Sequence, residues 1–107
     1  MPIPGNDGHY DVVWPRTALQ IATKALAPRL DSLDGKTIAE LWDYAYRGND
    51  VYEWMEVALK ARFPGVRFIN WREFGCTHGK DEHAVLAALP QRLKDFGVDA
   101  AISAMGN

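Results

Sequence analysis

Two short polar segments hold the side chains best suited to chemistry. The first, DYAYRGND, offers the carboxylate of Asp43 and the guanidinium of Arg47, a group suited to binding anions. The second, REFGCTHGKDEH, places Cys76 two residues before His78, a spacing compatible with a thiolate activated by an imidazole. Each segment also has a plainer interpretation, because the first can be a capped, solvated turn and the second a chance neighbourhood of two side chains.

Neither segment carries the signature of a familiar chemistry. A metal site built from Cys76, His78 and His83 would need loop flexibility to bring these residues together, so no metal is predicted. The chain has no GxGxxG, GxxxxGKS/T or GxSxG pattern, the usual signatures of dinucleotide binding, triphosphate binding and serine hydrolysis. The sequence therefore leaves the cofactor unknown.

The composition is that of an ordinary folded domain. Of the 107 residues, 48% are hydrophobic and 24% are charged, and the formal net charge of -2 offers no basic surplus for a nucleic acid. Cys76 is the single cysteine, so no intrachain disulfide can form and a cytoplasmic location is expected. The N-terminus has no basic start followed by an apolar core, and no long apolar run occurs, so neither secretion nor membrane insertion is expected.

Five regular elements are expected to position the polar segments. The runs TIAELWDY, VRFINW and VDAAISAM have the apolar and β-branched content of buried strands. A second helix is predicted in DEHAVLAALPQRLKDFG, kinked or interrupted at Pro90 and ended by Gly97. The first helix, DVYEWMEVALKARF, should place Trp54 in the core as part of one apolar stripe: Val51, Trp54, Met55, Ala58, Leu59 and Phe63.

This order of strand, helix, strand, helix and strand predicts an α/β fold, namely half of a doubly wound parallel sheet. Residues 36–107 should form this partial domain, and residues 1–35 an N-terminal extended arm. Sheet surface is left uncovered and must be met by the arm, by another copy or by a different chain. We expect a second protein chain to complete the sheet, and therefore a hetero-oligomer. The strand ends should form a crevice for a small-molecule substrate.

Two stretches of the chain resemble a known family. LDSLDGKTIAELWDYAYRGND and FPGVRFINWREFGCTHGKDEHAVLAALPQRLKDFGVDAAISAMGN resemble the UGSC family, with a similarity that spans roughly residues 26–107. These proteins are named for a selenocysteine-Gly-Ser-Cys motif, often Cys-Gly-Ser-Cys, and look distantly similar to the B-type selenoprotein subunits of glycine reductase. The resemblance implies an α/β fold and thiol or selenol chemistry of an oxidoreductase type.

The resemblance extends to particular positions. Asp43, Arg47 and Asn49 match the polar loop after the first strand, and Gly106 matches the glycine before the family signature. The signature itself would begin directly after the position of Asn107. Cys76 lies in the second polar segment, so the resemblance does not assign it the role of the family nucleophile.

The expected function combines the crevice with the resemblance. We expect the N-terminal subunit of a cysteine-dependent α/β enzyme, whose nucleophilic cysteine starts a second chain released by cleavage after Asn107. The alternative is a non-catalytic partner or scaffold subunit of a hetero-oligomer. Residues expected to orient substrate or handle protons in catalysis are Asp43, Arg47, His78 and Asn107. Residues expected to bind substrate are Tyr44, Asn49, Cys76 and Gly106.

Overall fold

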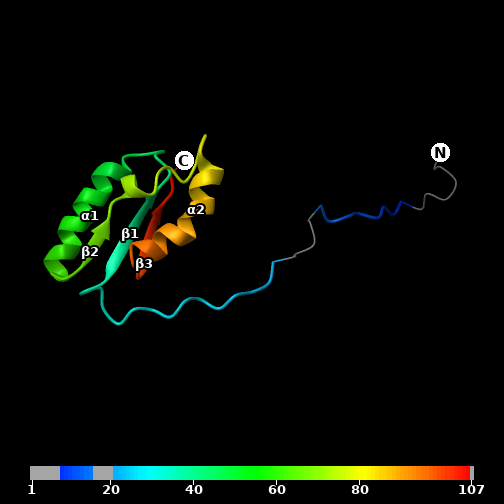
Figure 1. The fold of residues 1–107 in the computed structure, drawn as a ribbon. Coiled ribbons are helices and arrows are strands. Elements are labelled where there is room, and N and C mark those ends of the chain that lie inside the picture. The colour runs from blue at the N-terminus through cyan, green and yellow to red at the C-terminus, as the bar shows by residue number, and fades with distance from the viewer. Residues whose placement is uncertain (1–7, 16–20, 107) are drawn as a thin grey trace.

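A computed structural model of the chain describes residues 8–15 and 21–106. The regular elements confirm the predicted order of strand, helix, strand, helix and strand (Figure 1). A short 3-10 helix follows the second strand. The elements are β1 (Thr37–Trp42), α1 (Gly48–Arg62), β2 (Arg67–Ile69), η1 (Trp71–Glu73), α2 (Glu82–Asp95) and β3 (Ala100–Ala104).

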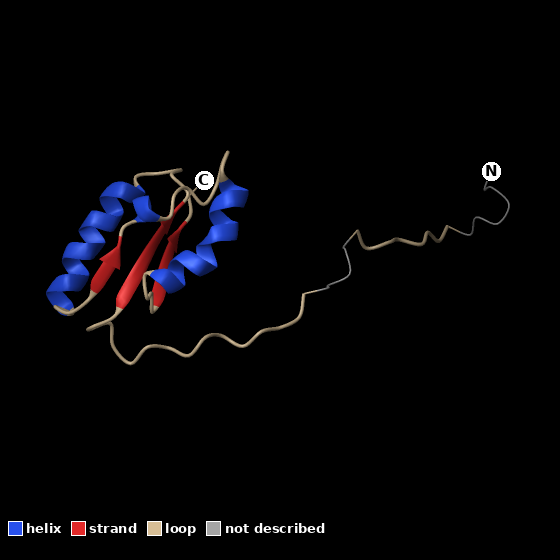
Figure 2. Ribbon diagram, viewed as in Figure 1, coloured by secondary structure: helices blue, strands red, loops and turns tan. Residues whose placement is uncertain are grey.

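The three strands form a parallel sheet in the order β2-β1-β3. β1 lies in the middle, where Ile38 pairs with Phe68 of β2 on one side and with Ala100 of β3 on the other. The chain therefore moves outward from β1 to β2 and then back past β1 to β3. Right-handed crossovers in opposite directions place their helices on opposite faces, and Figure 2 shows α1 and α2 flanking the strands.

The central strand is buried along its whole length, because one helix covers each of its faces. Ala39 and Leu41 point to the α2 face, where they form a core with Phe74. Leu89 and Leu93 of α2 pack against this core. Parallel strands that are covered on both sides have mostly apolar sequences, and TIAELW follows this pattern except at Thr37 and Glu40.

The opposite face of β1 is covered by α1 through two close contacts. The buried hydroxyl of Tyr52 lies 2.6 Å from the backbone oxygen of Leu41 and 2.8 Å from that of Ile102, so it can donate to either strand. Gly48, the first residue of α1, lies directly against the indole of Trp42. These contacts set which face of α1 turns toward the sheet.

The predicted burial of Trp54 is wrong. Its side chain is 62% exposed, whereas Tyr52 is only 1% exposed. Met55 and Leu59 of the predicted stripe are half-buried, but Val51 and Trp54 lie outside the core. α1 has apolar residues on both sides, and the hydrogen-bonded hydroxyl of Tyr52 decides which side is buried.

α2 is one continuous helix with Pro90 inside it. Figure 1 shows its axis changing direction between its yellow first half and its orange second half, as expected for an interior proline. The helix ends as predicted at Gly97, whose φ of 64° lies in the left-handed region. The amide of Val98 then donates to the backbone oxygen of Leu93 at 3.0 Å, which closes the last turn.

The chain that precedes β1 runs away from the sheet in Figure 1. Its described residues up to position 30 contain neither helix nor strand. Large apolar side chains on it are exposed, with Val12 at 89% and Leu26 at 86%. The remainder of the expected arm, residues 1–7 and 16–20, lies outside the described residues.

Candidate functional site

Three chain segments meet at the carboxyl edge of the sheet. They are the loop after β1, the segment after η1 and the residues after β3. The amide of Thr77 donates to the backbone oxygen of Trp42 at 3.1 Å, and the amide of Asp43 donates to that of Ala104 at 3.4 Å. Cys76 pairs with Trp42 as an isolated parallel bridge, so the sheet hydrogen bonding continues past the end of β2. The fold thus brings both polar segments to one place.

Asp43 joins two of these segments through its side chain. One carboxylate oxygen accepts from the amide of Ala45 at 3.0 Å, and the other accepts from the amide of Gly106 at 2.9 Å. These two hydrogen bonds, with a smaller contribution from His78, hold the pKa of Asp43 below its ordinary value. Asp43 is therefore an ionised anchor that fixes Gly106 relative to the loop after β1.

The thiol of Cys76 faces backbone oxygens. Its Sγ donates to the backbone oxygen of Asp43 at 3.2 Å and also contacts the backbone oxygen of His78. The imidazole of His78 is exposed, and its Nδ1 lies 3.6 Å from the carboxylate of Glu82. The hypothesis of a thiolate activated by His78 is not met by this geometry, because the sulfur approaches the main chain of His78 and its ring is directed to Glu82.

An aromatic cluster lines the same edge. It consists of Trp42, Tyr44, Tyr46 and Trp71, with ring centroids of neighbours 4.7 to 6.4 Å apart. Tyr44 has a φ of 63°, and among the described residues it alone has a positive φ without being glycine. Side chains rarely adopt this conformation, and such backbone strain is concentrated at functional sites. Burial raises the pKa of the Tyr44 hydroxyl.

Gly106 completes the edge by its small size. A side chain at this position would place its first carbon 2.5 Å from the ring of Tyr46, so glycine lets the chain after β3 pass the aromatic cluster at this distance. Asn107, which was expected to be catalytic, lies outside the described residues.

Two of the expected site residues lie at the start of α1, with Arg47 as its N-cap and Asn49 in its first turn. The guanidinium of Arg47 pairs with Asp50, with Nη2 and Oδ2 2.7 Å apart, and it lies 5.9 Å from the centroid of the Trp54 ring. Asn49 is exposed beside them. Arg47 is thus engaged on the outer side of α1, whereas Asp43, Cys76 and Gly106 are joined directly.

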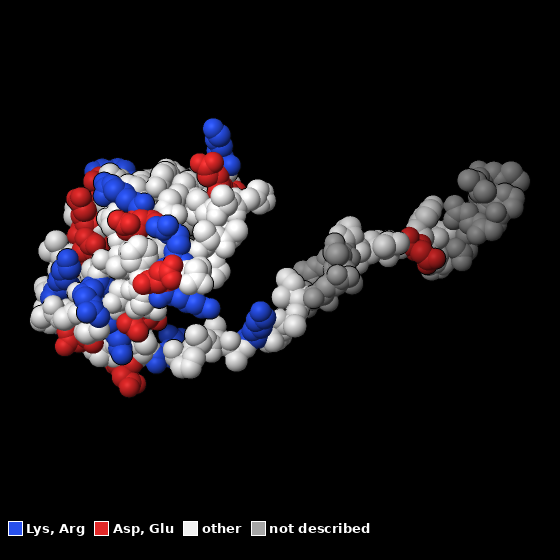
Figure 3. All heavy atoms as spheres, in the orientation of Figure 1, with Lys and Arg blue, Asp and Glu red and all other residues white. Residues whose placement is uncertain are grey.

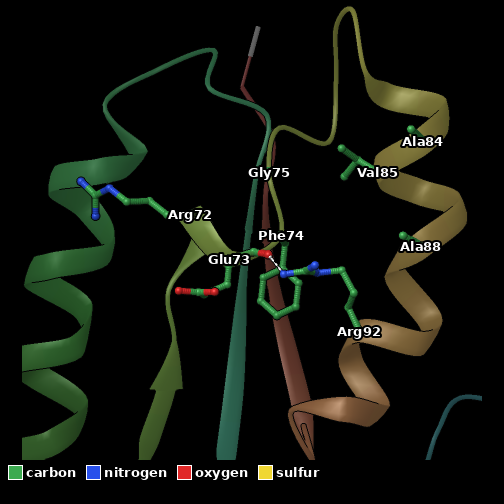
Figure 4. A pocket seen from close by; sticks show the side chains of 8 residues that line it. All are labelled: Arg72, Glu73, Phe74, Gly75, Ala84, Val85, Ala88 and Arg92. Atoms are coloured by element: carbon green, nitrogen blue, oxygen red, sulfur yellow. Dashed lines mark hydrogen bonds between the residues drawn. The ribbon is translucent and has the colours of Figure 1, made fainter.

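A groove of about 380 Å³ opens between η1 and α2, below the carboxyl edge (Figure 4). Phe74, Val85 and Ala88 give it apolar walls. Arg92 reaches across from α2 and donates to the backbone oxygen of Glu73, as the dashed line in Figure 4 marks. The Nε of Arg92 is buried and has no hydrogen-bond partner. This groove offers an apolar surface beside the edge, with the guanidinium of Arg92 against it and Arg72 at its rim.

Glu40 is a buried acid that the sequence analysis did not select. It is 0% exposed in the middle of β1, and neither of its carboxylate oxygens has a hydrogen-bond partner. Burial, and then the neighbouring carboxylate of Glu56, raises the pKa of Glu40 from 4.5 to about 8. A charged residue inside the apolar run TIAELW was the signal for this feature.

Comparisons with protein-family models, with curated proteins and with solved structures find no match to this chain. Within residues 8–15 and 21–106, no three His, Cys, Asp or Glu side chains are grouped so that they could hold a metal ion. No helix in the described part of the chain has the length and apolar character needed to cross a membrane. The evidence for function therefore comes from the geometry of the carboxyl edge.

Proposed function

We propose that the carboxyl edge is one wall of the active site of a cysteine-dependent α/β enzyme, with the nucleophilic cysteine supplied by a second chain. The observation that carries the proposal is the hydrogen bond between Asp43 and Gly106. In the resembling UGSC family the reactive motif follows the position of this glycine. An ionised Asp43 that holds Gly106 would orient the residues that come after it.

The other residues of the edge suit a small organic substrate. The aromatic cluster provides flat apolar surface, and the groove beside it has Arg92 as a cation for an acidic group. Cys76 would serve as a wall residue because its thiol is already engaged with the backbone oxygen of Asp43. A reducing cytoplasm would keep both this thiol and the proposed nucleophile available.

A scaffold function is the second candidate, and one observation favours it. Trp54 and Val57 on α1 are 62% and 72% exposed, which is unusual for large apolar side chains unless another surface covers them. Under this hypothesis the carboxyl edge contains only structural turns, and changes there would leave the activity of the assembly unchanged.

The test uses the native assembly, isolated through an affinity tag on the N-terminal arm. The assembly is treated with an iodoacetamide probe, and labelled cysteines are identified and timed by mass spectrometry. The proposal expects one fast-reacting cysteine outside this chain, and Asp43→Ala should slow its labelling about tenfold or more while the assembly stays intact. Asp95→Ala is the matched control, since Asp95 bonds only to Gln91 on the surface of α2.

Two results would count against the enzyme. The first is an assembly in which no cysteine reacts faster than Cys76. The second is an equal labelling rate in the Asp43→Ala and Asp95→Ala assemblies, which would favour the scaffold function.

A further inference from the structure

Glu40 places an acidic side chain inside the layer between β1 and α1. Ala39 and Leu41 point to the α2 face of the sheet, so Glu40, which lies between them on the strand, points to the α1 face. Figure 3 shows acidic and basic side chains spread over the visible surface of the folded part, whereas Glu40 is 0% exposed. An acid in this position must be paired or protonated, because burying an unpaired charge is costly.

The surroundings of Glu40 favour its protonated form. On the sheet it pairs with Ile102 of β3, which brings no charge. Burial, and then the Glu56 carboxylate of α1, disfavour the charged form, while the backbone amide of Trp71 in η1 and the ammonium of Lys60 on α1 favour it more weakly. Neither carboxylate oxygen of Glu40 has a hydrogen-bond partner. Glu40 therefore keeps its proton at neutral pH, with a pKa of about 8.

Two contacts that hold α1 to the sheet lie beside Glu40. The Tyr52 hydroxyl lies 2.6 Å from the backbone oxygen of Leu41, the next residue of β1. Burial, and then the charge of Glu40, raises the pKa of Tyr52 to about 12, so this hydroxyl remains a donor. Two residues after Glu40, on the same face of β1, the indole of Trp42 packs against Gly48 of α1. A charge on Glu40 would therefore develop directly beneath the attachment of α1.

Trp42 links this layer to the carboxyl edge. Its ring centroid lies 4.7 Å from those of Tyr44 and Trp71 in the aromatic cluster. Its indole Nε1 is buried and has no hydrogen-bond partner. Gly48 lies against this atom, and a Cβ at that position would be only 2.4 Å away. Movement of α1 away from the sheet would therefore expose the indole and loosen the aromatic cluster.

We propose that Glu40 is a pH-sensitive switch: the neutral acid keeps α1 packed on the sheet, and loss of its proton opens α1 locally and loosens the aromatic cluster. In the open form water reaches the carboxylate, which then titrates at its ordinary value of 4.5, whereas the closed form holds the proton up to about pH 8. The opening equilibrium therefore rises between these two values, by about tenfold for each pH unit because one proton is released, and is constant above them. The switch acts on the aromatic cluster whatever that cluster binds, so it is independent of the proposed enzyme.

The first test measures hydrogen exchange of the full chain by NMR between pH 5 and pH 8, corrected for the intrinsic effect of pH on exchange. Backbone amides of α1 and the indole N–H of Trp42 should lose about tenfold in protection for each pH unit. Amides of α2 should stay at least about tenfold more protected and depend more steeply on denaturant, because they exchange only when the whole chain unfolds. In Glu40→Gln, the protection of α1 should change by less than about twofold over the same range.

A second test shifts the switch without changing Glu40 itself. The titration midpoint of the Glu40 carboxyl carbon is followed by ¹³C NMR. Glu56→Gln removes a like charge and should lower the midpoint, whereas Lys60→Gln removes an opposite charge and should raise it, each by about half a pH unit or more. Above pH 8, the protection of α1 should then be about threefold higher in the first variant and about threefold lower in the second. Glu53→Gln and Lys94→Gln, at exposed positions, are the matched controls.

Three results would overturn the switch. The first is an unchanged pH dependence of α1 protection in Glu40→Gln. The second is equal protection and equal denaturant dependence of α1 and α2, because opening is then global. The third is a midpoint that Glu56→Gln and Lys60→Gln do not move in opposite directions. If Glu40→Gln fails to fold, the Glu56 and Lys60 variants decide the question, since both keep the native acid.

Discussion

The carboxylate of Asp43 accepts a hydrogen bond of 2.9 Å from the backbone amide of Gly106. This contact joins the loop after the central strand to the residue that follows β3, 63 positions later in the chain. The side chain of Asp43 is held ionised, and the amide of Gly106 belongs to the segment that follows β3 at the carboxyl edge of the sheet. The contact therefore fixes Gly106 relative to the loop after β1.

Asp43→Asn should make the chain less stable at neutral pH and less sensitive to acid. The folded-state pKa of Asp43 is lower than its ordinary value of 3.8, so its stabilising effect is present above that pH and is lost as the pH falls through the folded-state pKa. Denaturant melts between pH 7 and pH 2 check this. At pH 7 the variant should have a lower denaturation midpoint than the native chain. As the pH is lowered to 2, its midpoint should fall by less than that of the native chain. If the midpoints of the two proteins fell equally with pH, ionised Asp43 would not be a source of the acid-sensitive stability.

Glu40→Gln should remove a loss of stability that the native chain shows as the pH rises from 4.5 to about 8. The folded-state pKa of Glu40 is about 8 and its ordinary value is 4.5, so the folded chain keeps a proton that the unfolded chain releases. Stability is then greatest below pH 4.5 and falls as the pH rises to about 8, by roughly 3 to 5 kcal/mol from this one group. In denaturant melts across this pH range, the free energy of unfolding should change less with pH for Glu40→Gln than for the native chain. Glu73→Gln, which makes the same substitution at an exposed position, is the matched control.

Tyr52→Phe should lower the free energy of unfolding by about 1 to 3 kcal/mol. The phenol hydroxyl lies within hydrogen-bond distance of backbone oxygens in both β1 and β3, and its removal takes away the hydrogen bond between α1 and these strands. Chemical denaturation measures the difference. Tyr46→Phe, where the ring is 38% exposed, should change little. An equal effect of the two substitutions would mean that the Tyr52 hydroxyl does not tie α1 to the sheet.

Gly48→Ala should destabilise the chain, although alanine is the better helix former. A Cβ at this position would lie 2.4 Å from the Nε1 atom of Trp42, which the packed indole cannot accommodate without moving. Overpacking of this kind costs about 1 to 3 kcal/mol, more than the gain of about 1 kcal/mol in helix propensity. Thermal melts and Trp fluorescence would record both the lower stability and the displaced indole. Asn49→Ala, one residue later on the exposed side, should be neutral or slightly stabilising.

Local patterns were sufficient to predict the order of the elements and the end of α2. The alternation and β-branched content of the strands, the apolar spacing of the helices and Gly97 are all short-range signals. They were not sufficient to choose the buried face of α1, because Tyr52 and Trp54 are both aromatic and lie on different sides of the helix. Burial of Tyr52 depends on its hydroxyl meeting carbonyl oxygens of β1 and β3, which are distant in the sequence.

The candidate site divides in the same way. Residue types and strand ends were enough to select Asp43, Tyr44, Cys76 and Gly106 as residues of the carboxyl edge. Their pairing was not predictable, since the spacing of Cys76 and His78 says nothing about which way the imidazole turns. The structure directs that ring to Glu82 and the thiol to backbone oxygens.

The sequence by itself determined that this chain is a parallel α/β unit with polar loops at the carboxyl ends of its strands, because helix and strand periodicity and turn residues act over a few positions. Only the tertiary structure decided that β1 is central, that Asp43 holds Gly106, and that Trp54 lies outside the core. Each of these depends on packing and hydrogen bonds between segments that are far apart along the chain. Such contacts exist only once the sheet has assembled.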